Sequence, residues 1–206
     1  MKRGIRVFER YAREYDLWFE KNRPSYESEI ALLKKLVPDT GIGLEIGVGT
    51  GRFSCALGIE WGIDPAHNML LFARKRGIKV IKAEAEALPF KDSSFDFVAM
   101  ITVLCFLSSP ITALEEAKRV IRDKGYLIIG IIDGGSALGK AYESKKRKSK
   151  FYSHARFYSV KDIISWLEGL RFCVIKIYQT IFQDTYHAPI KKGYGEGGFV
   201  GILAKK

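Results

Sequence analysis

Residues 44–53, LEIGVGTGRF, combine an acidic side chain with a run of glycines. Gly47, Gly49 and Gly51 stand at alternate positions after an apolar run, and Glu45 comes two residues before the first of them. Glycine has no Cβ, so such a loop allows the backbone to approach a ligand closely. A carboxylate beside the loop repels a pyrophosphate and favours a ligand that carries an ammonium group.

A second acidic residue, Asp64, follows the next apolar run, 19 residues after Glu45. Its position at the end of a predicted strand would let it accept hydrogen bonds from both hydroxyl groups of a ribose, as in NAD-binding folds. Asp64 alone therefore does not separate NAD from other adenosine ligands. Together with Glu45 and the glycines, it favours a nucleoside that carries an amino-acid arm.

The glycine spacing also argues against two kinds of phosphate-binding loop. In the dinucleotide pattern G-x-G-x-x-G the third glycine comes one residue later than Gly51, where this chain has Arg52. No G-K-[ST] follows, which excludes a Walker-type loop. The loop still stands at the C-terminal end of the first predicted strand, where open α/β sheets bind their ligands.

Alternating strand and helix patterns predict the elements that position these residues. Two helices are predicted first, over 7–21 and from a Ser25 cap through Leu36. Strands are then predicted over 42–48, 59–64, 78–83, 95–103 and 126–132, with helices over 51–57, 65–76 and 110–123 between them. Such alternation indicates right-handed crossovers and a parallel sheet.

The C-terminal part has a different pattern. Ser159 and Asp162 form a capping motif for a helix that ends near Gly169. The β-rich runs at 172–182 and 199–204 are separated by a segment too short and glycine-rich for a crossover helix, so we expect them to pair antiparallel. The predicted fold is α/β: a doubly wound, mostly parallel seven-stranded sheet with an antiparallel C-terminal hairpin and helices on both faces.

We expect one domain over residues 1–206, a size that a single core can support. Its expected parts are an N-terminal helical cap (1–38) and a cofactor-binding core (42–133). A basic cap segment (134–158) and a terminal helix with a β-hairpin (159–206) follow.

The charge balance is compatible with an anionic partner and equally with a solvated, lysine-rich surface. The chain has 34 basic and 23 acidic side chains, a formal net charge of +11. Its most polarised segment, KKRKSK at 145–150, predicts either a solvated surface or a guide for a carboxylate, phosphate or RNA. The three cysteines show neither metal-ligand spacing nor a disulfide pattern, so we expect no metal. Without a signal peptide or an apolar run of the ~20 residues that a bilayer span needs, we expect a soluble, cytoplasmic protein.

Five motifs in series carry a resemblance to a known family. The chain contains, in this order, LEIGVGTGRF, GIDPAHNML, AEAEALPF, FDFVAMITVLCFL and ALEEAKRVIRDKGYLIIG. They resemble the motifs of class I S-adenosylmethionine-dependent methyltransferases, in particular the small-molecule, methyltransferase type 11-like group that includes quinone-biosynthesis methyltransferases. The likeness spans about residues 11–132. It implies S-adenosylmethionine as cofactor, S-adenosylhomocysteine as product, and no metal.

The resemblance also implies a role for each matching residue. Glu45 would orient the methionine ammonium group, and Asp64 would bind the ribose hydroxyls. The other implied cofactor contacts are Gly47, Gly49 and Gly51 (methionine and ribose), Pro65 and Met69 (sugar or adenine), Glu84 and Ala85 (adenine), and Ile101 and Thr102 (methionine arm). Two positions depart from the family pattern: Glu84 stands where Asp is more common, and RDKGYL replaces a proline–glycine pair.

Methyl transfer from such a cofactor depends on alignment rather than on a catalytic triad, because the sulfonium methyl group is already electrophilic. A general base is needed only where the nucleophile carries a proton, and His154 and Tyr15 are the candidates. Substrate contacts are expected in the two cap segments, from Tyr11, Trp18, Tyr152 and Tyr158. The expected reaction is in-line transfer to a small acceptor, for which the basic segment favours an anion.

Other function classes stay open at this stage. The basic, aromatic-rich segment is also compatible with an RNA-directed methyltransferase, or with a non-catalytic protein that binds the cofactor or RNA, although no RNA-binding module is recognisable. A NAD(P)-dependent oxidoreductase is disfavoured by the glycine spacing and by Glu45. The sequence gives no indication of the oligomeric state.

Overall fold

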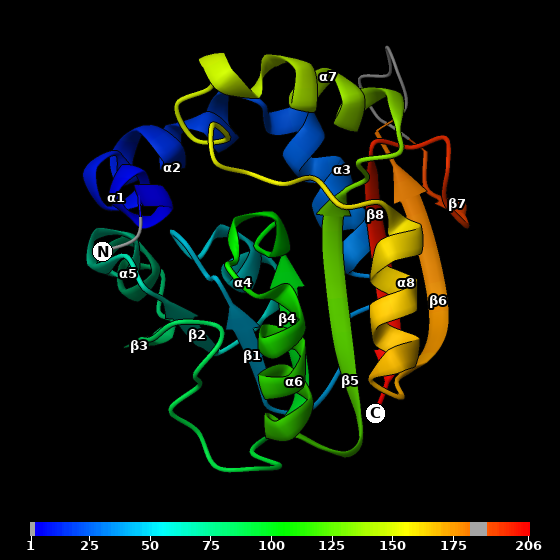
Figure 1. Cartoon of the computed structure of the whole chain (residues 1–206). Coiled ribbons are helices and arrows are strands. Elements are labelled where there is room, and N and C mark those ends of the chain that lie inside the picture. Colours follow the sequence, from blue (N-terminus) through cyan, green and yellow to red (C-terminus); the bar gives the residue numbers. More distant parts are fainter. Residues whose placement is uncertain (1–2, 182–188) are drawn as a thin grey trace.

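The computed structural model describes residues 3–181 and 189–206, which form one twisted sheet with helices on both faces (Figure 1). The strand order is β3-β2-β1-β4-β5-β8-β6-β7. The strands are β1 (Gly43–Ile46), β2 (Trp61–Asp64), β3 (Lys79–Lys82), β4 (Phe95–Ile101), β5 (Ile121–Ile132), β6 (Cys173–Thr180), β7 (Lys191–Lys192) and β8 (Phe199–Lys205). Strands β1 to β5 pair in parallel, and β8 runs antiparallel to both β5 and β6. The predicted sheet and its antiparallel C-terminal pair are confirmed.

The helices divide between the two faces and one end of the sheet. They are α1 (Arg3–Arg10), α2 (Ala12–Lys21), α3 (Arg23–Leu33), α4 (Arg52–Leu57), α5 (His67–Lys75), α6 (Pro110–Val120), α7 (Ala137–Lys145) and α8 (Val160–Gly169), with short 3₁₀ helices η1 (Leu104–Phe106) and η2 (Lys146–Lys148). In Figure 1, α6 and α8 cover one face of the sheet and α3 and α4 the other, while α7 lies above the C-terminal ends of β4 and β5.

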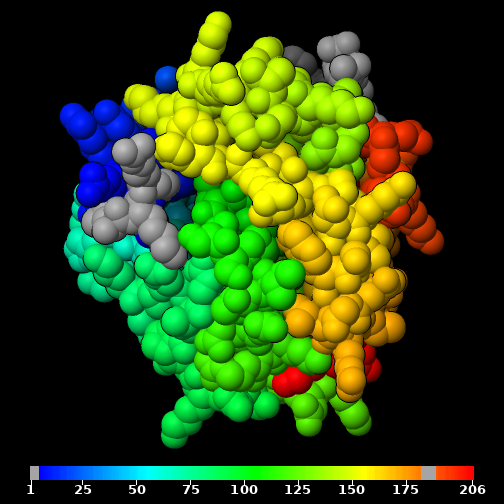
Figure 2. Space-filling model, in the orientation of Figure 1, coloured from blue at the N-terminus to red at the C-terminus, as the bar shows by residue number. Residues whose placement is uncertain are grey.

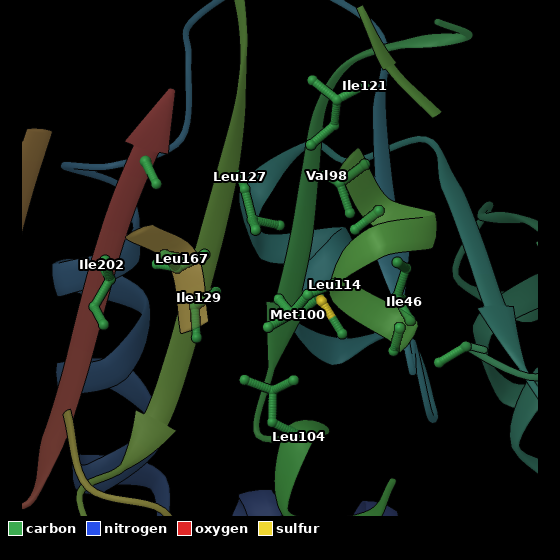
Figure 3. Packing of buried hydrophobic residues seen from close by; sticks show 14 of the residues in the cluster. Ile46, Val98, Met100, Leu104, Leu114, Ile121, Leu127, Ile129, Leu167 and Ile202 are labelled. Carbon is green, nitrogen blue, oxygen red and sulfur yellow. The ribbon is translucent and has the colours of Figure 1, made fainter. Parts of the chain in front are cut away.

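The central strand β4 packs on both faces, as its nearly continuous apolar sequence predicts. Val98 and Met100 belong to the cluster that includes Leu114 of α6 and Leu167 of α8 (Figure 3). Alternate residues, including Ala99, belong to the cluster on the opposite face, with α3. The two faces of one strand therefore anchor helices on both sides, and this fixes the loops at its C-terminal end.

The N-terminal helices differ from the prediction. The pattern over 7–21 forms two helices, α1 and α2, which are separated at Tyr11 (φ −119°, ψ 29°). The period of aromatic residues continues through this break, so the sequence shows no sign of it. Ser25 is not a cap: α3 starts at Arg23 and has Pro24 in its first turn. A proline fits there because the first helical N–H groups have no partner within the helix.

The boundary between α6 and β5 and the number of strands also differ from the prediction. Helix α6 ends at Val120, and β5 begins at the next residue, well before the predicted 126. The sheet has eight strands rather than seven, because the two-residue β7 pairs with Tyr178 and Gln179 of β6. A strand of two residues is too short to have a periodicity of its own. The predicted capping motif at the start of α8 is confirmed as a reciprocal capping box of Ser159 and Asp162, whereas Phe182 of the predicted run 172–182 lies outside the described residues.

Candidate active site

A cavity of about 330 Å³ opens at the C-terminal ends of β1, β2 and β4. Loops that follow these strands form its floor, and Ile5, Phe8 and Tyr15 of α1 and α2 close it from above. Most residues predicted to contact the cofactor line it: Gly47, Gly49, Asp64, Pro65, Met69, Glu84, Ala85, Ile101 and Thr102. The structure therefore brings four separate motifs to one cavity.

The glycine loop adopts backbone angles that favour glycine. Gly47, Gly49 and Gly51 have φ values of 74°, 53° and 80°, in the left-handed region where a side chain adds strain. Gly51 differs from the others in place: a Cβ there would come 2.8 Å from the Cα atom of Ala73 in α5, and Gly51 is not among the lining residues. Its described neighbours assign it to the packing of α5, rather than to the ligand approach expected from the sequence.

Asp64, at the end of β2, accepts hydrogen bonds from two loops. Its Oδ2 accepts a hydrogen bond from the Gly49 N–H at 3.1 Å, and its Oδ1 accepts one from the Ala66 N–H at 2.8 Å. Burial raises the pKa of Asp64 to about 6 despite these bonds. The carboxyl group is therefore fixed at the cavity wall and remains ionised above this pH.

Glu45 lies at the end of β1, behind the lining residues. Its side chain is 1% exposed and accepts a hydrogen bond from the Ser54 hydroxyl of α4. Burial raises the pKa of Glu45 to about 8, and the nearby charge of Asp64 adds to this shift. The two acids singled out in the sequence are thus electrostatic neighbours.

Tyr15 lies above the glycine loop. Its ring is 3.8 Å from the position that a Cβ on Gly49 would take, and burial raises the pKa of its hydroxyl group well above the usual range. The adjacent residue, Asp16, forms ion pairs with Arg52 at 2.9 Å and with Arg76 at 3.0 Å. These pairs connect α2 to the loop and to the end of α5. Arg52, the residue that replaces the third glycine of the dinucleotide pattern, therefore helps to position Tyr15.

A second cavity of about 270 Å³ lies beside the first, beneath α7 and the residues that follow it. Tyr15 and Thr102 line both cavities and form their common wall. Thr102 has φ 51°, and its N–H donates to the Gly130 carbonyl oxygen at 2.8 Å. Such a left-handed conformation in a threonine is strained and is typical of functional sites. The other walls are mainly aromatic and include Trp18, Phe19, Phe53, Tyr142, Phe151 and Tyr152.

The predicted substrate and base residues fall in three places. Trp18 and Tyr152 line the second cavity, and His154 lines the first. Tyr11 and Tyr158 are not among the residues that line either cavity. The ring of Tyr11 lies under the Lys150 ammonium group, 4.4 Å from the ring centroid, and Tyr158 packs edge-on against Trp166 of α8.

The basic segment lies over this end of the molecule, beside the blue N-terminal helices in Figure 2. Lys145, Arg147, Lys148 and Lys150 are exposed. The Lys150 ammonium group pairs with Glu14 of α2 at 2.6 Å, and Lys146 pairs with Glu143. Within the described residues, no lysine or arginine lines either cavity.

Sequence reasoning missed Glu29, which lines the second cavity. The signal was present: Glu29, Leu32, Leu33 and Leu36 follow the spacing of one helix face, and the three leucines belong to the core. An acid in that apolar series is a candidate for a buried functional group. Phe8 and Phe106, which line the first cavity, carried no comparable signal.

Residues 3–181 and 189–206 contain neither a metal-binding cluster nor a helix that could span a membrane. No group of three or more His, Cys, Asp or Glu side chains is arranged to hold a metal ion there. None of the helices in these ranges has both the length and the apolar character required to cross a bilayer.

Comparisons with known proteins identify the family. Residues 44–129 match a family model described as a methyltransferase domain. A crystal structure from Thermotoga maritima, of a "SAM-dependent methyltransferase, possible histamine N-methyltransferase", is 46% identical and has a TM-score of 0.93, with 98% of this chain and 99% of that chain covered.

Two curated relatives extend the comparison. An uncharacterised protein of Methanocaldococcus jannaschii is 53% identical over 98% of this chain and its own full length. A demethylmenaquinone methyltransferase of Staphylococcus aureus is 29% identical over 97% of this chain and 86% of its own length. These matches set aside the oxidoreductase alternative. The chain belongs to the S-adenosylmethionine-dependent methyltransferases.

Proposed function

We propose that the first cavity holds S-adenosylmethionine and that the second holds the methyl acceptor. The first cavity fits this cofactor in three respects. Its volume of about 330 Å³ lies within the usual range of ligand pockets, about 300–1,000 Å³. No lysine or arginine among the described residues lines it, in agreement with a ligand that carries positive rather than phosphate charge. Asp64 stands at its wall with a carboxyl group that can accept hydrogen bonds from a ribose.

The positions of the other predicted residues suggest which part of the cofactor each would contact. Glu45, an electrostatic neighbour of Asp64, would attract the methionine ammonium group. Glu84 and Ala85 line the cavity at the end of β3 and would face the adenine. Ile101 and Thr102 at the end of β4 would contact the methionine arm, on the side that borders the second cavity.

When bound, S-adenosylmethionine supplies a sulfonium methyl group that needs no further activation. An acceptor lone pair held in the second cavity would form the new bond to the methyl carbon, and the electrons of the broken carbon–sulfur bond would remain on sulfur. If the acceptor atom carries a proton, that proton leaves to solvent or to a neighbouring base. The chain contributes alignment and the exclusion of water, and proximity of this kind can supply ~7–11 kcal/mol. Tyr15 and Thr102 stand where the two reactants would meet.

One observation carries the acceptor assignment: the two cavities share the wall formed by Tyr15 and Thr102. A molecule in the second cavity would therefore lie next to the methyl-bearing end of the cofactor. The description of the Thermotoga maritima neighbour names histamine, an amine, as the possible acceptor of that protein, so amines belong in a screen of acceptors. The anionic acceptor and the RNA alternative have support only from the basic segment, whose lysine and arginine side chains line neither cavity.

The test is to fill the second cavity while leaving the first intact. In Ser25→Phe, the new ring would enter the second cavity, which Ser25 lines. We expect unchanged affinity for S-adenosylhomocysteine by calorimetry, but loss of transfer from methyl-labelled cofactor to a metabolite pool. Ser144→Phe on the exposed surface of α7 is the control. Retained transfer in Ser25→Phe would contradict the acceptor site, and failure of the wild-type protein to bind S-adenosylhomocysteine would contradict the cofactor site.

A further inference from the structure

Glu29 brings a buried carboxyl group to the second cavity, where no described residue is its partner. Its side chain is 7% exposed, and no hydrogen bond or ion pair joins it to any other residue in the described ranges. Burial raises the pKa of Glu29 to about 8. A buried carboxylate without a partner is costly, so the native fold tolerates here a group that contributes nothing evident to its stability.

Two other buried acids, Asp16 and Glu45, do have partners. Asp16 is paired with two arginines, and Glu45 accepts a hydrogen bond from Ser54. The titratable groups near Glu29 are three tyrosine hydroxyl groups, from Tyr15 of α2, Tyr142 of α7, and Tyr152. Burial raises the pKa of each of them, so all three are neutral at pH 7. Among the described residues that line the second cavity, Glu29 is thus the single one of the Asp, Glu, Lys, Arg and His types.

The walls around Glu29 favour a cation. The rings of Trp18, Phe19, Phe53 and Phe151 line the same cavity, and aromatic faces attract ammonium groups, with ~2 kcal/mol or more where water is excluded. A carboxylate in this surrounding repels carboxylates and phosphates, whereas an ammonium group supplies a counter-charge that no described residue of the cavity wall provides. Aromatic walls also accept an apolar or aromatic body beside the charge.

We propose that Glu29 selects the acceptor: the second cavity takes a small molecule that carries a protonated amine next to an apolar or aromatic body, and the Glu29 carboxylate is its counter-ion. This inference rests on the proposed function of the cavity as the acceptor site. It differs from the anionic acceptor that the basic segment suggested.

The pairing has a consequence that can be measured without catalysis. At pH 7 the carboxyl group of the empty cavity is mainly protonated, because its pKa is about 8. An entering ammonium group favours the carboxylate, so binding releases about one proton per ligand. A neutral ligand of the same shape releases none.

The experiment compares three ligands of similar shape by calorimetry, with S-adenosylhomocysteine present. The ligands are 2-phenylethylamine (cationic), 2-phenylethanol (neutral) and 3-phenylpropanoate (anionic). Each titration is repeated in buffers of different ionisation enthalpy, which reports the protons released. The variants are Glu29→Gln, which removes the charge and retains the shape, and Glu27→Gln. Glu27 is exposed on the same helix and pairs with Arg23, so it is the matched control.

We expect the amine to bind the wild-type protein and Glu27→Gln at least roughly tenfold more tightly than the alcohol, as a charge-assisted bond would give, with release of about one proton. Glu29→Gln should lose both the preference and the proton release while retaining its affinity for S-adenosylhomocysteine. Equal binding of amine and alcohol, preference for the carboxylate, an unaffected Glu29→Gln, or no binding of any of the three ligands would each overturn the inference. If the wild-type protein does not bind S-adenosylhomocysteine, the proposed function itself is overturned.

Discussion

Glu45 and Glu29 are both buried glutamates, but only Glu45 has a hydrogen-bond partner among the described residues. Each is almost fully buried, and burial raises the pKa of each to about 8. Glu45 accepts a hydrogen bond from Ser54 and lies in β1, just before the glycine loop, where the Gly49 N–H donates a hydrogen bond to the Asp64 carboxylate. Glu29 has no partner among the described residues and faces a cavity built from side chains. If the two cavities hold the ligands that we propose, the cofactor site is organised before binding, whereas the acceptor site is completed by its ligand.

The two cavities are also formed by different parts of the fold. The first follows the ends of adjacent strands, so the sheet itself places its loops. The second cavity is lined by side chains of α2, α3, α7 and the residues that follow α7. Contacts between aromatic rings stabilise this arrangement: the ring centroids of Phe151 and Tyr15 are 5.4 Å apart, and those of Tyr142 and Tyr152 are 5.2 Å apart. A change in the first cavity should therefore affect a fixed geometry, and a change in the second should mainly affect ligand selection.

The largest effect is expected at Asp64 in the first cavity. Asp64→Ala removes the acceptor proposed for the ribose hydroxyls and the bonds to Gly49 and Ala66. We expect the affinity for S-adenosylhomocysteine to fall by roughly 100-fold or more, since each charge-assisted bond contributes ~1.5–3 kcal/mol. Calorimetry provides the measurement, with the exposed Asp92→Ala as control. Unchanged affinity would show that the ribose binds elsewhere.

A comparison of two glycines tests the fixed geometry of the loop. Gly51→Ala introduces a Cβ against Ala73 in a left-handed conformation and should reduce the free energy of unfolding by about 2–4 kcal/mol. Gly58 has a similar φ of 71°, but no atom lies within 4 Å of an added Cβ, so Gly58→Ala should cost about 1 kcal/mol. Urea denaturation distinguishes the two. Equal losses would mean that close packing against α5 contributes little.

The pH dependence of stability tests the unpartnered Glu29. The folded protein retains the Glu29 proton up to about pH 8, whereas the unfolded chain loses it near its ordinary pKa of 4.5. Because the folded state binds the extra proton within this window, its stability falls as pH rises through it. Between pH 5 and 7.5, the wild-type protein should lose roughly 3 kcal/mol of its free energy of unfolding relative to Glu29→Gln, because each pH unit in this window contributes ~1.4 kcal/mol. Parallel curves for the two proteins would contradict a buried, unpaired carboxyl group.

The smallest effect is expected in the basic segment. Lys150 and Glu14 form a partly exposed ion pair, and such pairs contribute less than about 1 kcal/mol. Lys150→Ala should therefore change the free energy of unfolding only slightly and should leave methyl transfer unchanged. A large loss of transfer to acidic acceptors in this variant would restore the basic segment as a substrate guide. Glu14→Gln, which removes the partner and keeps Lys150, separates the two causes.

Much of the site could be predicted from the sequence because its residues lie next to strand ends. Asp64 and Thr102 follow apolar runs directly, and parallel strands bring such ends to one edge of a sheet. Gly51 shows the limit: the motif predicts that the backbone must be bare there, but only the fold shows that α5, rather than a ligand, occupies the space. The break at Tyr11 and the two-residue β7 were missed because neither interrupts or creates a periodic pattern.

The sequence by itself determined the mostly parallel sheet and its antiparallel C-terminal pair, and it predicted the edge at which we propose that the cofactor binds, since these depend on local periodicity and on chain connectivity. Only the tertiary structure decided which side chains form the proposed acceptor cavity. Glu29 and Tyr142 are more than a hundred residues apart in the chain and share that cavity because their helices pack at the same end of the sheet. Burial and the absence of a partner are properties of that packing, and no local pattern records them.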